Sequence, residues 1–165
     1  MPNVFDSDWE HELAVGDMVL RATRVGQQAG ARALGAALYE VEAGSGVSPY
    51  HVHHANEELL LVLAGRPTVR TPDGERELRA GDLVAFPAGP DGAHRVDNRA
   101  DEPARVLLVS TMVAPDVVEH PDSRKVLVLT GDIEGDTPPR AFRMEDEVPP
   151  FAGELPEPPR SLRDH

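Results

Sequence analysis

The chain of 165 residues lacks cysteine, carries a single lysine (Lys125) and has an aromatic content of 4%. Without cysteine, a disulfide framework, thiolate catalysis and thiolate-bound zinc or iron–sulfur sites are excluded. No apolar run approaches the roughly 18–20 residues that a membrane-spanning helix needs. Residues 1–6 have neither a basic start nor an apolar stretch, so we expect no secretory signal and a cytoplasmic protein.

The charge balance is strongly one-sided, with 29 acidic residues against 16 basic ones and a net charge of −13. Nucleic-acid binding needs a basic stripe that neutralises phosphates, and binding to an anionic membrane surface needs clustered lysine or arginine. The composition therefore predicts neither kind of partner. A small-molecule ligand or substrate is the expected partner.

Short strand-like runs, separated by turns rich in glycine and proline, dominate the sequence. Segments of this length with turns at short intervals predict an all-β sandwich or barrel in one domain. The expected strands cover residues 15–25, 33–42, 58–63, 67–71, 75–78, 82–86, 93–98, 104–111 and 125–129.

Helical periodicity is weak, and we expect at most single helical turns at residues 6–14 and 114–120. Residues 1–30 are predicted to form an N-terminal arm or extra strand, and residues 31–130 the β-barrel. Residues 131–165 are acidic and proline-rich, which is incompatible with a central strand or a long helix. This C-terminal tail is expected to be either an extended arm, lying across the domain or a partner subunit, or a mobile segment.

Three histidines lie within four positions, in the run His-Val-His-His-Ala-Asn-Glu-Glu at residues 51–58. If His51 and His53 lie on a strand, their side chains point to the same face, because successive side chains alternate between faces. His54 and Glu57 are then expected to face outward. The chain's other histidines are expected at the surface: His11, His120 and His165.

Glu58 opens an apolar run and is expected to point inward with Leu60 and Val62. A carboxylate buried in this way is costly unless it is paired or ligated. His94 follows a glycine- and proline-rich loop and can add a third imidazole from another strand. Imidazole and carboxylate groups together suit a divalent first-row metal such as Fe, Mn, Ni, Co or Zn, with open positions for chemistry. The alternative is that these histidines are simply packed or exposed residues of a β-sandwich.

These residues resemble the two motifs of the cupin superfamily. The first motif runs Gly, a short gap, His-x-His, three or four residues, Glu, six residues, Gly; the second runs Gly, five residues, Pro-x-Gly, a gap, His, three residues, Asn. The resemblance covers about residues 33–112 and selects Glu58 over Glu57 as the family-type ligand. The matching residues are His51, His53, Glu58 and Gly65, then Gly81, Pro87, Gly89, His94 and Asn98.

The sequence departs from the family pattern at two places. Ser45 stands where the first motif begins with glycine, and the gap before His94 has four residues instead of the usual two. The resemblance implies a double-stranded β-helix of the jelly-roll type in a small bacterial cupin. It also implies one divalent metal ion bound by His51, His53, Glu58 and His94, and a homodimer.

Two function classes are compatible with such a site. The first is a metal-dependent enzyme, of the dioxygenase or isomerase type, acting on a small polar or carboxylated molecule. The second is a non-catalytic metal-containing domain that binds or senses a sugar or an acid. Tyr39, on the more apolar face of its strand, is the candidate for contact with a substrate, although a packed core tyrosine is the alternative. Four arginines are candidates for clamping an anionic group: Arg66, Arg70, Arg95 and Arg99.

Overall fold

Alternation of buried and exposed side chains fixes which face of each central strand lies inside the molecule. The computed structural model describes residues 1–6, 8–131 and 138–154. In it Leu60 and Val62 are buried, Leu61 between them is partly exposed, and Leu59 before them is 39% exposed. A period of two is the signature of a strand with one buried face. The buried set comes from both sheets of the barrel and from Leu78, just after a strand of the smaller sheet: Leu60, Val62, Val69, Leu78, Phe86, Val96 and Val106.

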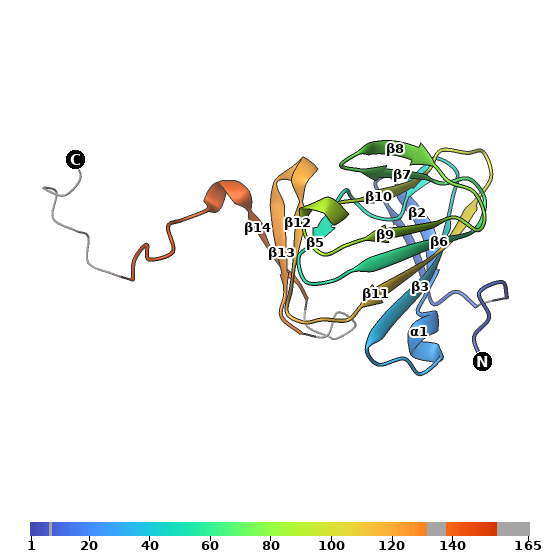
Figure 1. Ribbon diagram of the computed structural model, residues 1–165, viewed down its shortest axis with the longest axis horizontal. Helices are drawn as coiled ribbons and strands as arrows, with labels where there is room; N and C mark the ends of the chain where they lie inside the picture. The colour runs from blue at the N-terminus through green and yellow to red at the C-terminus, as the bar shows by residue number, and fades with distance from the viewer. Residues whose placement is uncertain (7, 132–137, 155–165) are drawn as a thin grey trace, which may run out of the picture.

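Two antiparallel sheets enclose this core (Figure 1). The larger has the order β1-β2-β3-β11-β6-β9 and the smaller the order β4-β10-β7-β8. The larger sheet consists of β1 (His11–Val15), β2 (Met18–Thr23), β3 (Leu34–Val41), β11 (Ala104–Thr111), β6 (Glu58–Ala64) and β9 (Leu83–Phe86). The smaller consists of β4 (Ser45–Gly46), β10 (Arg95–Asn98), β7 (Thr68–Thr71) and β8 (Gly74–Glu77).

A third sheet, with the order β14-β13-β12-β5, lies beside the barrel at the end where the histidines are found. It consists of β14 (Arg140–Arg143), β13 (Lys125–Leu129), β12 (Asp116–His120) and β5 (Val52–His53). The short helical turns are α1 (Val25–Gln28), η1 (Pro90–Gly92), η2 (Pro121–Ser123) and η3 (Met144–Asp146). The architecture is all-β and confirms the predicted double-stranded β-helix.

The two ends of the chain differ from the sequence-based expectations. Residues 15–25 were expected to be one strand, but β1 and β2 form a hairpin whose turn has Gly16 at φ 60°. Residues 6–14 and 114–120 were expected to contain helical turns; instead they contribute β1 and β12, because each is paired along a neighbouring strand. No helix in the described ranges is long and apolar enough to cross a membrane.

Part of the C-terminal tail is ordered by pairing. β14 adds to β13 as an edge strand, a position in which the prolines on either side need not donate to a ladder. The prediction of an extended or mobile tail also covers Pro156, Pro158 and Pro159, which lie outside the described residues.

Leu60→Ala is expected to lower the free energy of unfolding by about 2–5 kcal/mol, because it removes a fully buried side chain from the core between the sheets. Leu34→Ala is the matched control, since Leu34 begins β3 of the same sheet and is 53% exposed. The control should change stability by less than about 1 kcal/mol. Urea unfolding curves of the two variants measure the difference, and equal losses would contradict the assignment of the core.

Candidate metal centre

Backbone pairing brings the predicted ligand residues together from three separate segments. His51 and His94 face each other across an isolated bridge, in which each backbone N–H donates to the other residue's carbonyl at 3.0 and 2.8 Å. His53 ends β5, two residues beyond His51, and therefore presents its side chain on the same side. Glu58 begins β6, between β9 and β11, and points inward in line with Leu60.

The four side chains converge on one carboxylate oxygen. The Nε2 atoms of His94, His53 and His51 lie 3.2, 3.7 and 3.9 Å from Oε2 of Glu58. Ligand atoms of His51, His53 and Glu58 all lie within 4.8 Å of one another, and His94, outside that group of three, joins it through its contact with Glu58. The exposed fraction of the four side chains ranges from 3% for His94 to 17% for His53. The predicted quartet is therefore a single, largely buried cluster.

The hydrogen bonds of the three imidazoles determine which nitrogen faces the cluster. The Nδ1 atom of each ring lies beside an oxygen acceptor: the carbonyl of Pro49 at 2.9 Å for His51, the Asp116 carboxylate at 2.6 Å for His53, and the carbonyl of Gly92 at 2.9 Å for His94. Because Nδ1 donates in each case, a neutral ring directs the lone pair of Nε2 at Glu58. Three acceptor nitrogens facing an acceptor oxygen are an arrangement that a bound cation satisfies, so the donor set fits a divalent metal.

The protonation states suit this role. Burial lowers the pKa of His51 to about 4, with the charges of His94 and His53 acting in the same direction, so the ring is neutral at pH 7. Burial on its own would raise the pKa of Glu58. A hydrogen bond from His94, and the positive charge of the imidazoles whenever they are protonated, outweigh it, and the pKa of Glu58 lies below its usual value. Metal binding requires neutral imidazole and ionised carboxylate, and the lowered pKa values of His51 and Glu58 favour these forms.

Asp116 is a part of the site that the sequence did not reveal. Its carboxylate, 1% exposed, accepts hydrogen bonds from His53 Nδ1, from the Ala55 backbone N–H at 2.9 Å and from the Asn56 side-chain amide at 2.9 Å. Burial raises the pKa of this carboxyl, but these three donors more than compensate and hold the pKa below its ordinary value. Asp116 therefore fixes the tautomer and orientation of His53, the usual function of a carboxylate behind a ligating histidine.

The lengthened loop before His94 does not displace its ring. The additional residues form η1, whose last carbonyl, that of Gly92, accepts the hydrogen bond from His94 Nδ1. A side chain at Gly92 would place its Cβ 1.8 Å from the carbonyl oxygen of Pro87, so only glycine allows this close turn. On its other side the imidazole of His94 stacks on Phe86, with ring centroids 3.7 Å apart.

Histidines outside the quartet take several positions. His54 is exposed and lies 3.4 Å from Glu119, and Glu57 is also exposed, as expected from strand alternation. His120, expected at the surface, is partly buried, and its ring stacks on that of His51 with the ring centroids 6.1 Å apart. His11 is exposed but lies at the rim of a cavity. The prediction for His165 lies outside the described residues.

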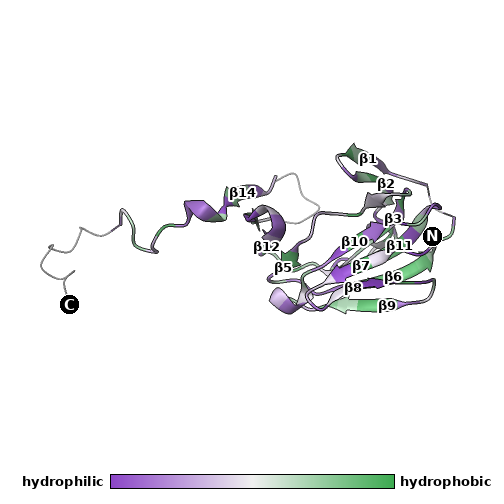
Figure 2. Cartoon of the chain, turned by 90° about the horizontal axis from the view of Figure 1, so that it is seen from above, coloured by the Kyte–Doolittle hydropathy of each residue, from purple (hydrophilic) through white to green (hydrophobic). Residues whose placement is uncertain are grey.

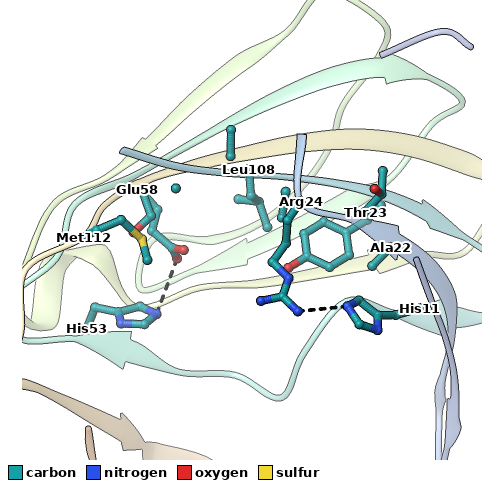
Figure 3. Close-up of a pocket in the computed structure, with 13 residues that line it drawn as sticks. His11, Ala22, Thr23, Arg24, His53, Glu58, Leu108 and Met112 are labelled. Carbon is teal, nitrogen blue, oxygen red and sulfur yellow. Dashed lines mark hydrogen bonds and ion pairs between the residues drawn. The ribbon is translucent and has the colours of Figure 1, made fainter. Parts of the chain in front are cut away.

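A cavity of about 530 Å³ opens onto the cluster, and its wall includes His53 and Glu58 (Figure 3). Tyr39 also lines it, and burial together with the Glu58 carboxylate raises the pKa of this phenol to about 12. The arginines expected to clamp an anion point elsewhere. Each is paired with carboxylates outside this cavity: Arg66 with Glu77, Arg70 with Asp122, Arg95 with Asp17 and Asp97, and Arg99 with Glu75. The arginine that lines the cavity, among the described residues, is Arg24.

The fold is a double-stranded β-helix, and three histidines and one glutamate form a buried cluster inside it. These two features place the chain among small β-barrel proteins with a candidate metal centre. A family model described as a cupin domain matches residues 37–110, the region that contains both histidine segments. The chain belongs to the cupin superfamily. No curated protein matches the sequence.

Solved structures similar to the chain include two with related descriptions. One, from Acidithiobacillus ferrooxidans, is described as a provisional sugar phosphate isomerase: it is 27% identical, with a TM-score of 0.72, over 80% of this chain and 81% of that one. The other, a sugar phosphate isomerase of the cupin superfamily from Silicibacter pomeroyi, is 28% identical, with a TM-score of 0.69, over 77% and 78% of the two chains. A predicted oxalate decarboxylase from Thermotoga maritima, 19% identical with a TM-score of 0.51 over 57% and 81%, shares the fold.

The metal-free protein is expected to lose stability as the pH falls from about 6.5 to about 4. In this window an unfolded chain protonates His51, whose pKa there is the ordinary 6.5, whereas the folded chain, with a pKa of about 4, does not. The unfolded state then binds more protons, so acid favours unfolding. Thermal melts of chelator-treated protein at pH 7 and pH 5 measure this, and His51→Gln should reduce the dependence. A melting temperature that rises on acidification would contradict the assignment.

Proposed function

We propose that the protein is a metal-dependent isomerase acting on a small phosphorylated sugar, with one divalent ion (Fe, Mn, Ni or Zn) held by His51, His53, Glu58 and His94. The observation that carries the proposal is the convergence of these four donors at the wall of a cavity large enough for a small ligand. The similarity to the two sugar phosphate isomerase structures, over about four-fifths of the chain, supports the choice of reaction.

Each group of the site has a task in this reaction. A divalent ion at the four donors supplies Lewis-acid polarisation of a substrate oxygen. Isomerisation of an aldose to a ketose moves a proton between adjacent carbons and builds negative charge on the carbonyl oxygen. The Tyr39 hydroxyl, which its raised pKa of about 12 keeps protonated well above neutral pH, donates a hydrogen bond to such an oxygen. The apolar side chains of Leu108 and Met112 in the cavity wall exclude water from the same space.

The experiment is a metal-by-substrate matrix. Protein stripped with chelator and reloaded with Fe(II), Mn(II), Ni(II), Co(II) or Zn(II) is incubated with glucose 6-phosphate, mannose 6-phosphate or ribose 5-phosphate, and ketose formation is followed by ¹³C NMR. Interconversion that requires a metal and ceases on chelation is the expected result. Oxygen uptake with a small acid in place of interconversion would favour a dioxygenase, and tight binding of a sugar without turnover would favour a binding domain; either contradicts the proposal.

We also propose a homodimer formed through the outer face of β6 and β9. Leu59 and Leu83 are 39% and 59% exposed on this face, and Figure 2 shows both strands as hydrophobic. Exposed apolar side chains grouped on adjacent strands are typical of a surface covered by a partner. Sedimentation equilibrium at micromolar concentration tests this, and a monomeric mass would contradict it.

A further inference from the structure

The end of the cavity away from the four donors is built by the N-terminal hairpin. His11 of β1, and Thr23 and Arg24 at the end of β2, line the cavity together with His53 and Glu58. Figure 3 shows Glu58 and His53 at one end and Arg24, Thr23 and His11 at the other, with Leu108 lying between the two groups in this view. The hairpin therefore completes the cavity on the side opposite the candidate metal centre.

The guanidinium group of Arg24 differs from those of other arginines that lie against the barrel. Arg21 and Arg105 share the carboxylate of Glu40, whereas the guanidinium of Arg24 has no ion pair with any residue in the ranges 1–6, 8–131 and 138–154. Within the part of the chain that the structure describes, its side-chain hydrogen bond runs from Nη2 to the Nε2 of His11, at 3.1 Å. The neighbouring carboxylate of Glu10 is engaged otherwise: it accepts from the Arg24 backbone N–H and from the side-chain amide of Gln28.

A guanidinium that forms no close ion pair within the described residues is notable in a chain with 29 acidic and 16 basic residues. Its charge acts on the neighbouring Glu10 carboxyl, whose pKa it helps to lower, but Glu10 directs its hydrogen bonds elsewhere. Of the five N–H donors of a guanidinium, one bond goes to His11, so the others are available to a ligand. Arginine is the side chain best suited to binding phosphate through paired N–H donors. The wall of the cavity thus has a cationic donor group at one end and metal-ligating atoms at the other.

We propose that Arg24, oriented by His11, is the subsite that binds the phosphate group of the substrate while the sugar carbonyl end lies against His51, His53, Glu58 and His94. This inference rests on the proposed isomerase function and adds the group that selects a phosphorylated sugar over a neutral one. The pKa of Tyr39 responds to both ends, raised by burial and by Glu58 and lowered by Arg24, so this phenol lies within electrostatic reach of both. In this arrangement one sugar phosphate lies in the cavity of about 530 Å³ that both ends line.

The test compares binding of ribose 5-phosphate, ribose, inorganic phosphate and ribonate to metal-loaded protein by calorimetry and ³¹P NMR. Arg24→Gln should weaken binding of ribose 5-phosphate and inorganic phosphate by about 10–100-fold, the loss typical of a charge-assisted contact, and leave ribose unchanged. Arg24→Lys should restore part of the affinity. Arg76→Gln is the matched control, because Arg76 is exposed on β8, outside this cavity. This variant should bind all four compounds as the unmodified protein does.

His11 is a positioning residue in this scheme. His11→Ala should therefore weaken ribose 5-phosphate binding by a few-fold, about the loss expected when one hydrogen bond to the guanidinium is removed, and leave ribose binding unchanged. An equal effect on both sugars would indicate a structural role for His11 instead.

The outcomes separate this subsite from the proposed reaction. If Arg24→Gln binds ribose 5-phosphate within two-fold of the unmodified protein, or weakens ribose equally, the phosphate subsite is wrong even if isomerisation is observed. If Arg24→Gln weakens the binding of ribonate but not that of ribose 5-phosphate, the phosphate subsite is also wrong, and a carboxylate ligand is favoured. If binding of the phosphate ester depends on Arg24 but no sugar phosphate is interconverted, the subsite stands and the isomerase proposal falls. Elemental analysis should give the same metal content in Arg24→Gln as in the unmodified protein.

Discussion

Replacing His51 with alanine is expected to strip the protein of its metal and, with it, of any catalytic activity. His51 is one of three imidazoles whose Nε2 atoms face Glu58, and its Nδ1 is bonded to the Pro49 carbonyl, so no other atom of the ring can take its place. Loss of a residue that is hydrogen-bonded to a metal ligand costs about 10–100-fold in metal affinity. Loss of a ligand itself should therefore cost at least about 100-fold. Elemental analysis after dialysis measures the occupancy, which should fall from about one ion per chain to a small fraction.

His54→Ala provides the matched control for this substitution. His54 lies in the same segment, three residues along the chain from His51, but its ring is exposed and lies 3.4 Å from Glu119. It should therefore retain the full metal content. Circular dichroism distinguishes metal loss from unfolding in His51→Ala. A folded His51→Ala protein that keeps its metal would contradict the assigned ligand set.

The residues that the sequence identified are those whose positions follow from local rules. Strand alternation alone places His51 and His53 on one side, and the apolar run after Glu58 requires that carboxylate to face inward with Leu60. His94 was assigned through the resemblance to a known motif, and the structure places it directly opposite His51. Local spacing, together with that motif, was sufficient for the geometry of the quartet.

The residues that the sequence missed depend on pairing between distant segments. Asp116 is 63 residues from His53, and it reaches the imidazole because β12 pairs with β5 in a register that sets Val118 opposite His53. Nothing in the local sequence around Asp116 specifies that register, and the segment was expected to be helical. At the N-terminus one local signal did indicate the hairpin. The Gly16-Asp17 dipeptide is a typical two-residue hairpin turn, and it lies inside the range expected to be one strand. The second strand of this hairpin leads to Arg24 in the cavity wall.

Asp116→Asn is expected to weaken metal binding by about 10–100-fold without removing any ligand. The carboxylate accepts a hydrogen bond from Nδ1 of His53 and thereby keeps the proton off Nε2. An amide in its place can donate to Nδ1, which moves the proton to Nε2 and withdraws that atom from the metal. Because the same carboxylate also accepts from Ala55 and Asn56, the free energy of unfolding should fall by about 1–3 kcal/mol as well.

Two measurements distinguish this role from a purely structural one. Competition with a chelator of known affinity gives the metal dissociation constant, and long-range ¹⁵N NMR of the metal-free protein reports which imidazole nitrogen of His53 carries the proton. Glu119→Gln is the matched control, since Glu119 lies on the same strand but faces the exposed His54. The tautomer should change in Asp116→Asn and be retained in the control. Lower stability with an unchanged tautomer and unchanged metal affinity would limit Asp116 to holding residues 53–56 in place.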